Sequence, residues 1–225
     1  MAQDPTENKF SAVEETLSRT EMYIEENQKK LTIIIAAIAV VLAGYMSYNK
    51  FIAEPNEYRA QQEIFAAQQY FEKDSFNLAL NGDGNYSGFL YIIDTYGSTK
   101  TGNLANYYAG ISYLRTGDFN NAITYLKDFS SSDLIIAPMA LGGIGDAYME
   151  LGNTDQAISY YLKAAKKSKN ALTAPHYLLK AGIAYEISGN FNKAVETYSE
   201  LKKDYSESQQ GKSIEKYIAR ATEKR

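Results

Sequence analysis

Residues 81–85 (NGDGN) carry the alternating oxygen-bearing side chains with which a calcium-binding loop begins. Such a loop needs a glycine at its sixth position for the sharp turn and a glutamate at its twelfth for bidentate binding. Tyr86 and Ile92 occupy these positions here. The segment is therefore predicted to be a polar surface loop.

The other candidates for chemistry are a glycine run and one histidine. Residues 142–145 (GGIG) have glycines as a nucleotide-binding loop does, but no strand pattern precedes them and no further glycine follows. They predict close helix packing instead. His176 is the only histidine, and alone it makes neither a metal site nor a catalytic triad. The chain has no cysteine, which excludes disulfides and thiol chemistry. We therefore expect no enzyme activity, cofactor or small-molecule substrate.

The charge of the chain argues against a nucleic-acid partner. Residues 1–49 contain four basic and seven acidic residues, whereas residues 50–225 contain 19 basic and 20 acidic residues. The long C-terminal part is thus almost neutral, and nucleic-acid binding requires an excess of positive charge. We expect no nucleic-acid partner.

An apolar stretch from Leu31 to Tyr48 contains no Asp, Glu, Lys, Arg or His. As a helix it would be about 27 Å long, close to the hydrocarbon thickness of a bilayer. Lys30 precedes it, and Tyr48 and Lys50 mark its other end as interfacial residues do. The sequence predicts a transmembrane helix over residues 31–50, with Pro55 interrupting the helix a few residues beyond.

Two alternatives and the orientation stay open at this point. A cleaved signal peptide would fit the small residue Ala43, but its leader should be short and basic, whereas this one is thirty residues long and acidic overall. A buried core helix would be unusually apolar. Basic residues on the two sides of the span are nearly balanced, so the positive-inside rule favours a cytoplasmic N-terminus only slightly.

Residues 1–30 are predicted to form an acidic cytoplasmic tail that can be helical. Its apolar side chains fall near one helical face, and its glutamates lie mostly elsewhere. This face, predicted to bind a partner, consists of Phe10, Val13, Leu17 and Ile24.

Beyond the span, one residue frame occurs three times. It consists of Gly, Tyr three residues later, a second Gly at +7 and Ala at +12. The copies are Gly110-Tyr113-Gly117-Ala122, Gly145-Tyr148-Gly152-Ala157 and Gly182-Tyr185-Gly189-Ala194. Periodicity near 3.6 and a repeat of about 35 residues predict stacked helical hairpins.

Each position of the frame has a physical role. The first Gly and the Ala let two helices approach closely, and the second Gly ends the first helix in a left-handed turn. Large residues follow one helical turn after each alanine: Leu126, Tyr161 and Tyr198. Pro138 and Pro175 fit the start of a first helix, where a missing N–H is tolerated.

A degenerate helix pair precedes the three repeats over residues 55–101. Ala67, Tyr70, Phe76 and Ala79 fit the frame, with Asp74 in place of the turn glycine and the polar loop inserted afterwards. At the other end, Ile214, Tyr217, Ile218 and Ala221 predict an amphipathic capping helix.

The frame resembles the tetratricopeptide repeat (TPR), a 34-residue helix–turn–helix. Together with the predicted span and capping helix, the resemblance predicts an all-α fold: a single N-terminal transmembrane helix followed by a TPR-like α-solenoid with a C-terminal capping helix. The three repeats span about residues 103–136, 138–171 and 175–208 within the segment 102–225. The large aromatic that often opens the motif is absent, since Asn106, Leu141 and Leu178 stand there.

In a TPR, residues spaced i, i+3, i+7 and i+10 on each first helix line a concave groove. Most are apolar here, which suits an extended or helical apolar guest, although a neighbouring segment could equally fill the groove. Only Lys180 would suit the capture of an acidic peptide terminus. The predicted groove residues are Leu104, Tyr107, Ile111, Leu114, Met139, Gly142, Asp146, Met149, His176, Leu179, Ile183 and Glu186.

The order of tail, span, degenerate pair, three TPRs and cap resembles the YfgM-type proteins of Gram-negative bacteria. This resemblance implies a single-pass inner-membrane protein with a cytoplasmic N-terminus and a periplasmic TPR domain. It also implies association with the Sec translocon and a PpiD-type peptidyl-prolyl isomerase, and handling of secreted client chains. The alternative is a structural or assembly scaffold of the cell envelope, for cell division or outer-membrane biogenesis, without client chains.

Overall fold

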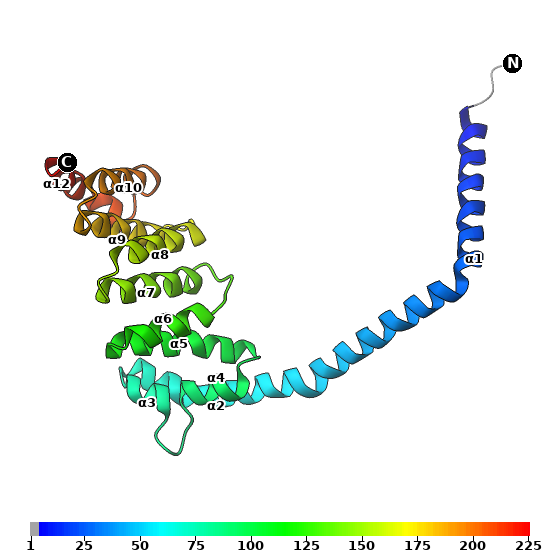
Figure 1. Ribbon diagram of the computed structural model, residues 1–225, viewed down its shortest axis with the longest axis horizontal. Helices are drawn as coiled ribbons and strands as arrows, with labels where there is room; N and C mark the ends of the chain where they lie inside the picture. The colour runs from blue at the N-terminus through cyan, green and yellow to red at the C-terminus, as the bar shows by residue number, and fades with distance from the viewer. Residues whose placement is uncertain (1–4) are drawn as a thin grey trace. The chain divides into compact units, whose positions relative to one another are not determined.

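The computed structural model describes the backbone of residues 5–225 and the side chains of residues 21–225. Within these residues the chain is helical and contains no strand, as the sequence predicted. It divides into two compact units, Met1–Pro55 and Asn56–Arg225, each of which is described by itself (Figure 1).

The N-terminal unit is built from α1 (Pro5–Tyr48) and a π-helical turn, η1 (Asn49–Ala53). One helix of the described chain is long and apolar enough to cross a membrane, and none of its apolar window is buried in the protein. The expectation that the helix is interrupted at Pro55 is wrong, because the helical segment continues without a gap to Glu72, with Pro55 in the first turn of α2 (Glu54–Glu72). The Glu54 N–H donates to the Asn49 carbonyl in the wider π-helical pattern, which is a common adjustment where proline disturbs the α-helical ladder.

The second unit is a stack of helical hairpins. Figure 1 shows α5 to α10 succeeding one another along the stack. The helices after α2 are α3 (Phe76–Asn81), α4 (Phe89–Tyr96), α5 (Lys100–Thr116), α6 (Phe119–Asp128), α7 (Ile136–Glu150), α8 (Thr154–Lys167), α9 (Thr173–Ile187), α10 (Phe191–Asp204), α11 (Gln209–Ser213) and α12 (Glu215–Glu223).

The turns inside the hairpins follow the predicted frame. Gly117, Gly152 and Gly189 have φ angles of 85°, 73° and 76°, in the left-handed region that glycine adopts without steric cost. Asp74 takes the same place in the degenerate pair with φ 54°, and it is the one non-glycine with positive φ among the described residues. Each frame turn ends in a residue whose side chain caps the next helix, as Asn153 accepts from the Gln156 N–H.

The first glycine of each frame faces the large residue of the second helix. A Cβ on Gly145 would lie 2.6 Å from the Tyr161 ring, and one on Gly110 would lie 2.5 Å from Leu126 Cγ. Gly182 is covered in the same way by the Tyr198 ring. The prediction of close helix approach is confirmed, and the partner of each glycine is now identified. The glycines at 142 and 143 also pack against side chains, of Tyr177 and Leu126.

Both ends of the stack are closed by apolar packing. At the first end, Phe89 stacks on Tyr108 with ring centroids 5.1 Å apart, and Phe71 meets both rings edge-on. At the other end, Ile214 and Ala221 are fully buried around the predicted capping helix, which is α12. The polar loop at residues 82–88 separates α3 from α4.

Candidate partner-binding surfaces

The predicted groove residues lie on α5, α7 and α9, but they differ in solvent exposure. Tyr107 is buried and packs against Phe129. Gly142 is buried beneath the Tyr177 ring and does not line a groove, Met139 is exposed, and the remaining side chains of the set are half-buried. Ile111 contacts α7, because its Cδ1 lies 3.4 Å from the position of a Cβ on Gly143. Ile183 packs against the core shared by α8, α9 and α10.

Asp146 on α7 is engaged inside the solenoid. It accepts a hydrogen bond of 2.6 Å from the Tyr161 hydroxyl on α8 and two of 2.8 Å from Lys180 Nζ on α9. The three side chains therefore join two helices of one repeat to the first helix of the next. Lys180, the only groove residue that would suit an acidic peptide terminus, is already paired with this carboxylate.

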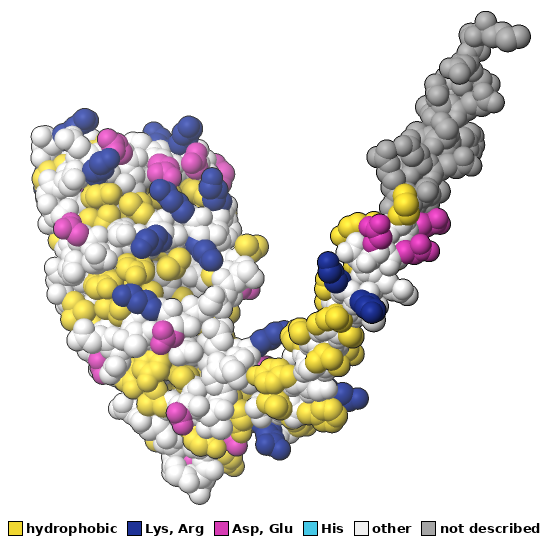
Figure 2. Space-filling view, turned by 45° about the vertical axis from the view of Figure 1, so that its right-hand side comes forward, with side chains coloured by type: hydrophobic (Ala, Val, Ile, Leu, Met, Phe, Trp, Pro, Cys, Tyr) yellow, Lys and Arg dark blue, Asp and Glu magenta, His cyan; other side chains and the backbone are white. Residues whose placement is uncertain are grey.

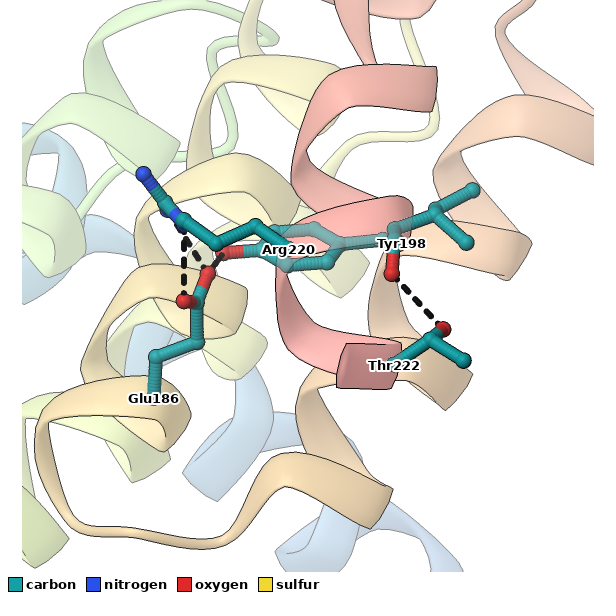
Figure 3. Close-up of polar contacts among 5 residues, drawn as sticks. Glu186, Tyr198, Arg220 and Thr222 are labelled. Carbon is teal, nitrogen blue, oxygen red and sulfur yellow. Dashed lines mark hydrogen bonds and ion pairs between the residues drawn. The ribbon is translucent and has the colours of Figure 1, made fainter. Parts of the chain in front are cut away.

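Glu186 on α9 repeats this arrangement one repeat later (Figure 3). Its Oε1 accepts 2.6 Å and 2.8 Å hydrogen bonds from the Tyr198 hydroxyl and Arg220 Nη2, and its Oε2 accepts a 3.0 Å bond from Arg220 Nε. Thr222 lies beside them on α12, with its hydroxyl bonded to the Ile218 carbonyl. The capping helix is thus attached by a polar contact as well as by its apolar face.

Burial and hydrogen bonding shift the pKa values of these groups. Burial and the adjacent Asp146 carboxylate raise the pKa of Tyr161 far above its ordinary value. Burial and the bond to Glu186 do the same for the pKa of Tyr198. Burial alone would raise the pKa of Glu186, but the bonds from Arg220 and Tyr198 outweigh it and lower that pKa. Both tyrosines thus remain hydrogen-bond donors at neutral pH.

Sequence reasoning missed these two networks because it assigned Asp146 and Glu186 to a binding face. A signal was present: Asp146 and Lys180 are 34 residues apart, as are Glu186 and Arg220. That separation is one repeat, so an acid and a base at this spacing lie on neighbouring first helices. Only the fold shows that a tyrosine of the intervening helix completes each network.

His176 is half-buried beside the Tyr177 ring, with ring centroids 5.0 Å apart. Burial and the nearby Lys180 charge lower the pKa of His176. The side chain is therefore neutral at pH 7.

A second candidate surface lies where α2 meets the polar loop. Arg59, Phe65, Tyr86 and Tyr96 line a hollow of about 380 Å³, and the Ser87 hydroxyl donates to Glu63 at its edge. Within the loop, both carboxylate oxygens of Asp83 are used, one by the Tyr70 hydroxyl and the other by the N–H groups of Asn85 and Tyr86. Asp83 therefore shapes the loop itself.

The predicted tail face lies on α1. Phe10, Val13 and Leu17 lie outside the residues whose side chains are described, whereas Ile24 is exposed on α1.

Comparison with known families agrees with this geometry. The tetratricopeptide-repeat family matches residues 107–171 and 143–208, two overlapping windows that together cover α6 to α10. Residues 107–208 therefore match tetratricopeptide repeats. No curated protein sequence matches the chain.

Solved structures share the TPR-like fold at low sequence identity. A kinesin-light-chain candidate from Podosopora anserina with nearly identical TPR-like repeats has a TM-score of 0.56 and 14% identity, over 74% of this chain and 86% of that chain. That structure is of a single-residue variant, and the unsubstituted protein gives the same values. The MamA protein has a TM-score of 0.51 and 17% identity, over 75% and 91% of the two chains. These similarities show a TPR-like solenoid.

Proposed function

We propose that this protein is a non-enzymatic scaffold that holds protein partners beside a membrane. TPR repeats are a protein–protein interaction scaffold, and this part of the proposal rests on the family match. The anchoring rests on a single observation, the apolar and unburied helix at residues 31–48. The proposed location is the bacterial inner membrane, with the N-terminus in the cytoplasm and the TPR domain in the periplasm.

The proposed partners are the Sec translocon and a PpiD-type isomerase, with secreted client chains as guests. The support is the order of elements shared with YfgM-type proteins: acidic tail, one span, degenerate pair with a loop insert, three repeats and a cap. The repeats alone do not select these partners, so the assignment needs a direct test.

The proposed binding surface is the first-helix face, with an apolar segment as the guest. Met139 is the exposed apolar side chain of this face and Leu104 is half-buried, whereas the half-buried Leu114, Met149 and Leu179 also pack against the core. Met139 is the most useful probe because it is exposed and takes no part in the carboxylate networks. Flexible methionine and leucine side chains adapt to varied apolar guests.

Site-specific crosslinking tests the partners, and the absence of cysteine makes the experiment clean. Met139→Cys and Leu179→Cys would each carry a photocrosslinker in the full chain, with Thr124→Cys on the exposed side of α6 as the control. We expect the first two to capture translocon subunits, the isomerase or nascent secreted chains, and the control not to. Capture of stable envelope proteins alone would favour the structural scaffold instead.

Topology is tested separately by protease added to spheroplasts. The proposed orientation predicts degradation of the TPR domain after Pro55 and protection of the tail. A protected TPR domain would contradict the periplasmic location without affecting the repeat fold.

A further inference from the structure

Two neighbouring loops form one edge of the solenoid, between α6 and α7 and between α8 and α9. Asn170 Nδ2 of the second loop donates a 2.8 Å hydrogen bond to the Leu134 carbonyl of the first. Each loop is fixed in place by a side-chain cap: Asp133 accepts from the N–H groups of Ile135 and Ile136, and Asn170 accepts from those of Leu172 and Thr173. The edge is therefore an ordered surface.

This edge displays two leucines to solvent. Leu134 is 65% exposed and Leu172 is 66% exposed. Both stand on loops, one in each of two successive repeats, and neither loop needs a leucine there for its capping bonds, which use backbone N–H groups. Large aliphatic side chains exposed at equivalent places in two successive repeats are available to enter an apolar phase.

The second loop of this edge is basic, whereas the first contains Asp133 and is flanked by Lys127 and Asp128. Residues 156–185 contain five lysines and no acidic residue, although the chain beyond the span is almost neutral. Lys180 is paired with Asp146, whereas Lys163, Lys166, Lys167 and Lys169 have no carboxylate within 4 Å among the described side chains. Lys166 and Lys167 lie in the last turn of α8, and Lys169 lies between them and Leu172. Figure 2 shows basic and acidic side chains interspersed with hydrophobic patches over the solenoid face in view.

We propose that this Leu–Lys edge (Leu134, Leu172, Lys166, Lys167 and Lys169) rests on a bilayer surface that contains anionic lipid. Leucines would enter the interfacial layer while the lysine ammonium groups contact headgroup phosphates, which is the arrangement of interfacial protein segments. Each lysine near an anionic surface strengthens such contact by about fivefold. The proposal rests on the membrane anchoring proposed above, because the anchor keeps the domain near the bilayer and raises its effective concentration there.

A bilayer fits these observations better than a protein partner does. The leucines project singly from loops instead of lining a concave pocket, and a planar apolar layer accepts projecting side chains without a shaped counterpart. The clustered lysines match a surface with many phosphates, and no precise pairing geometry is required.

The test uses the full chain reconstituted into liposomes, with single cysteines carrying an environment-sensitive fluorophore. Leu134→Cys and Leu172→Cys probe the edge. Leu151→Cys is the matched control: this leucine is 44% exposed at the α7–α8 turn, between Glu150 and Asp155. Gly44→Cys reports the anchor, since a Cβ added there meets no atom within 4 Å. Liposomes contain phosphatidylcholine alone or with phosphatidylglycerol, and a lipid-attached quencher reports contact.

In liposomes with phosphatidylglycerol, we expect quenching of the labels at positions 134 and 172 but not at 151. Substituting Lys166, Lys167 and Lys169 with Gln should lower the quenching at both positions to the level at 151. High salt should have the same effect. If the labels at 134 and 172 are quenched no more than the label at 151 while the label at 44 is quenched, the anchor is in the bilayer but the Leu–Lys edge does not contact it. That result would overturn the proposal. An unquenched label at position 44 would overturn the anchor itself. Equal quenching without anionic lipid, or shielding only after a protein partner is added, would also overturn the proposal.

Discussion

Glu186 and Arg220 are 34 residues apart in sequence and are joined by hydrogen bonds of 2.8 Å and 3.0 Å between α9 and α12. The Glu186 side chain is 9% exposed and the Arg220 side chain is 48% exposed. The pair therefore links the capping helix to the last repeat. Its carboxylate is shielded from solvent, whereas its guanidinium is partly exposed.

Arg220→Ala is predicted to destabilise the solenoid. It leaves a nearly buried carboxylate with only the Tyr198 hydroxyl as a donor, which should cost about 1–2 kcal/mol after allowing for the solvent exposure of Arg220. Urea unfolding of the full chain in mild detergent measures the loss. Lys193→Ala is the control, because its pair with Glu196 is exposed and should contribute less than about 0.5 kcal/mol. Equal losses in both variants would contradict the prediction.

The Glu186 network also predicts a pH dependence. The folded pKa of Glu186 is lowered below its ordinary value of 4.5. Its contribution to stability is therefore fully present above pH 4.5 and is lost as the pH falls through the lowered folded value. The difference in unfolding free energy between the native chain and Glu186→Gln should be constant from pH 7 to about pH 5 and shrink in more acidic solution. A difference that grows on acidification would reverse the assigned sign.

Gly182→Ala is predicted to destabilise the third repeat by about 1–3 kcal/mol, because the added methyl group overlaps the Tyr198 ring. Gly189→Asn in the same repeat is the matched control. Its φ angle is 76°, asparagine tolerates left-handed backbone, and no atom lies within 4 Å of an added Cβ. Thermal melting should therefore separate the two variants, with Gly189→Asn close to the native chain.

Ile111→Lys is predicted to lower the melting temperature, whereas Met139→Lys should not. Ile111 is half-buried against α7, so a lysine there would lose apolar packing and strain the contact between α5 and α7. Met139 is exposed, and a lysine can extend into solvent there. Loss of partner crosslinking in Met139→Lys, without early melting, would support the groove. A normal melt for Ile111→Lys would instead show that α5 packs on α7 without it.

The sequence by itself determined the helical hairpins and their turns. The positions of Gly117, Gly152, Gly189 and even Asp74 were predictable, because a left-handed turn is a local backbone requirement that few residue types meet. The apolar segment from Leu31 was equally evident, since length and composition alone define a candidate span.

Only the tertiary structure decided which polar side chains of the predicted groove are available to bind a partner. Asp146 and Glu186 have the right helical spacing for a groove, but tyrosines and bases from other helices engage both. Pro55 similarly failed to interrupt the helix, because a π-helical turn precedes it. Periodicity places a residue on a face of its own helix, whereas partners on two other helices depend on how the repeats stack. That stacking is a property of the assembled solenoid, which no single repeat encodes.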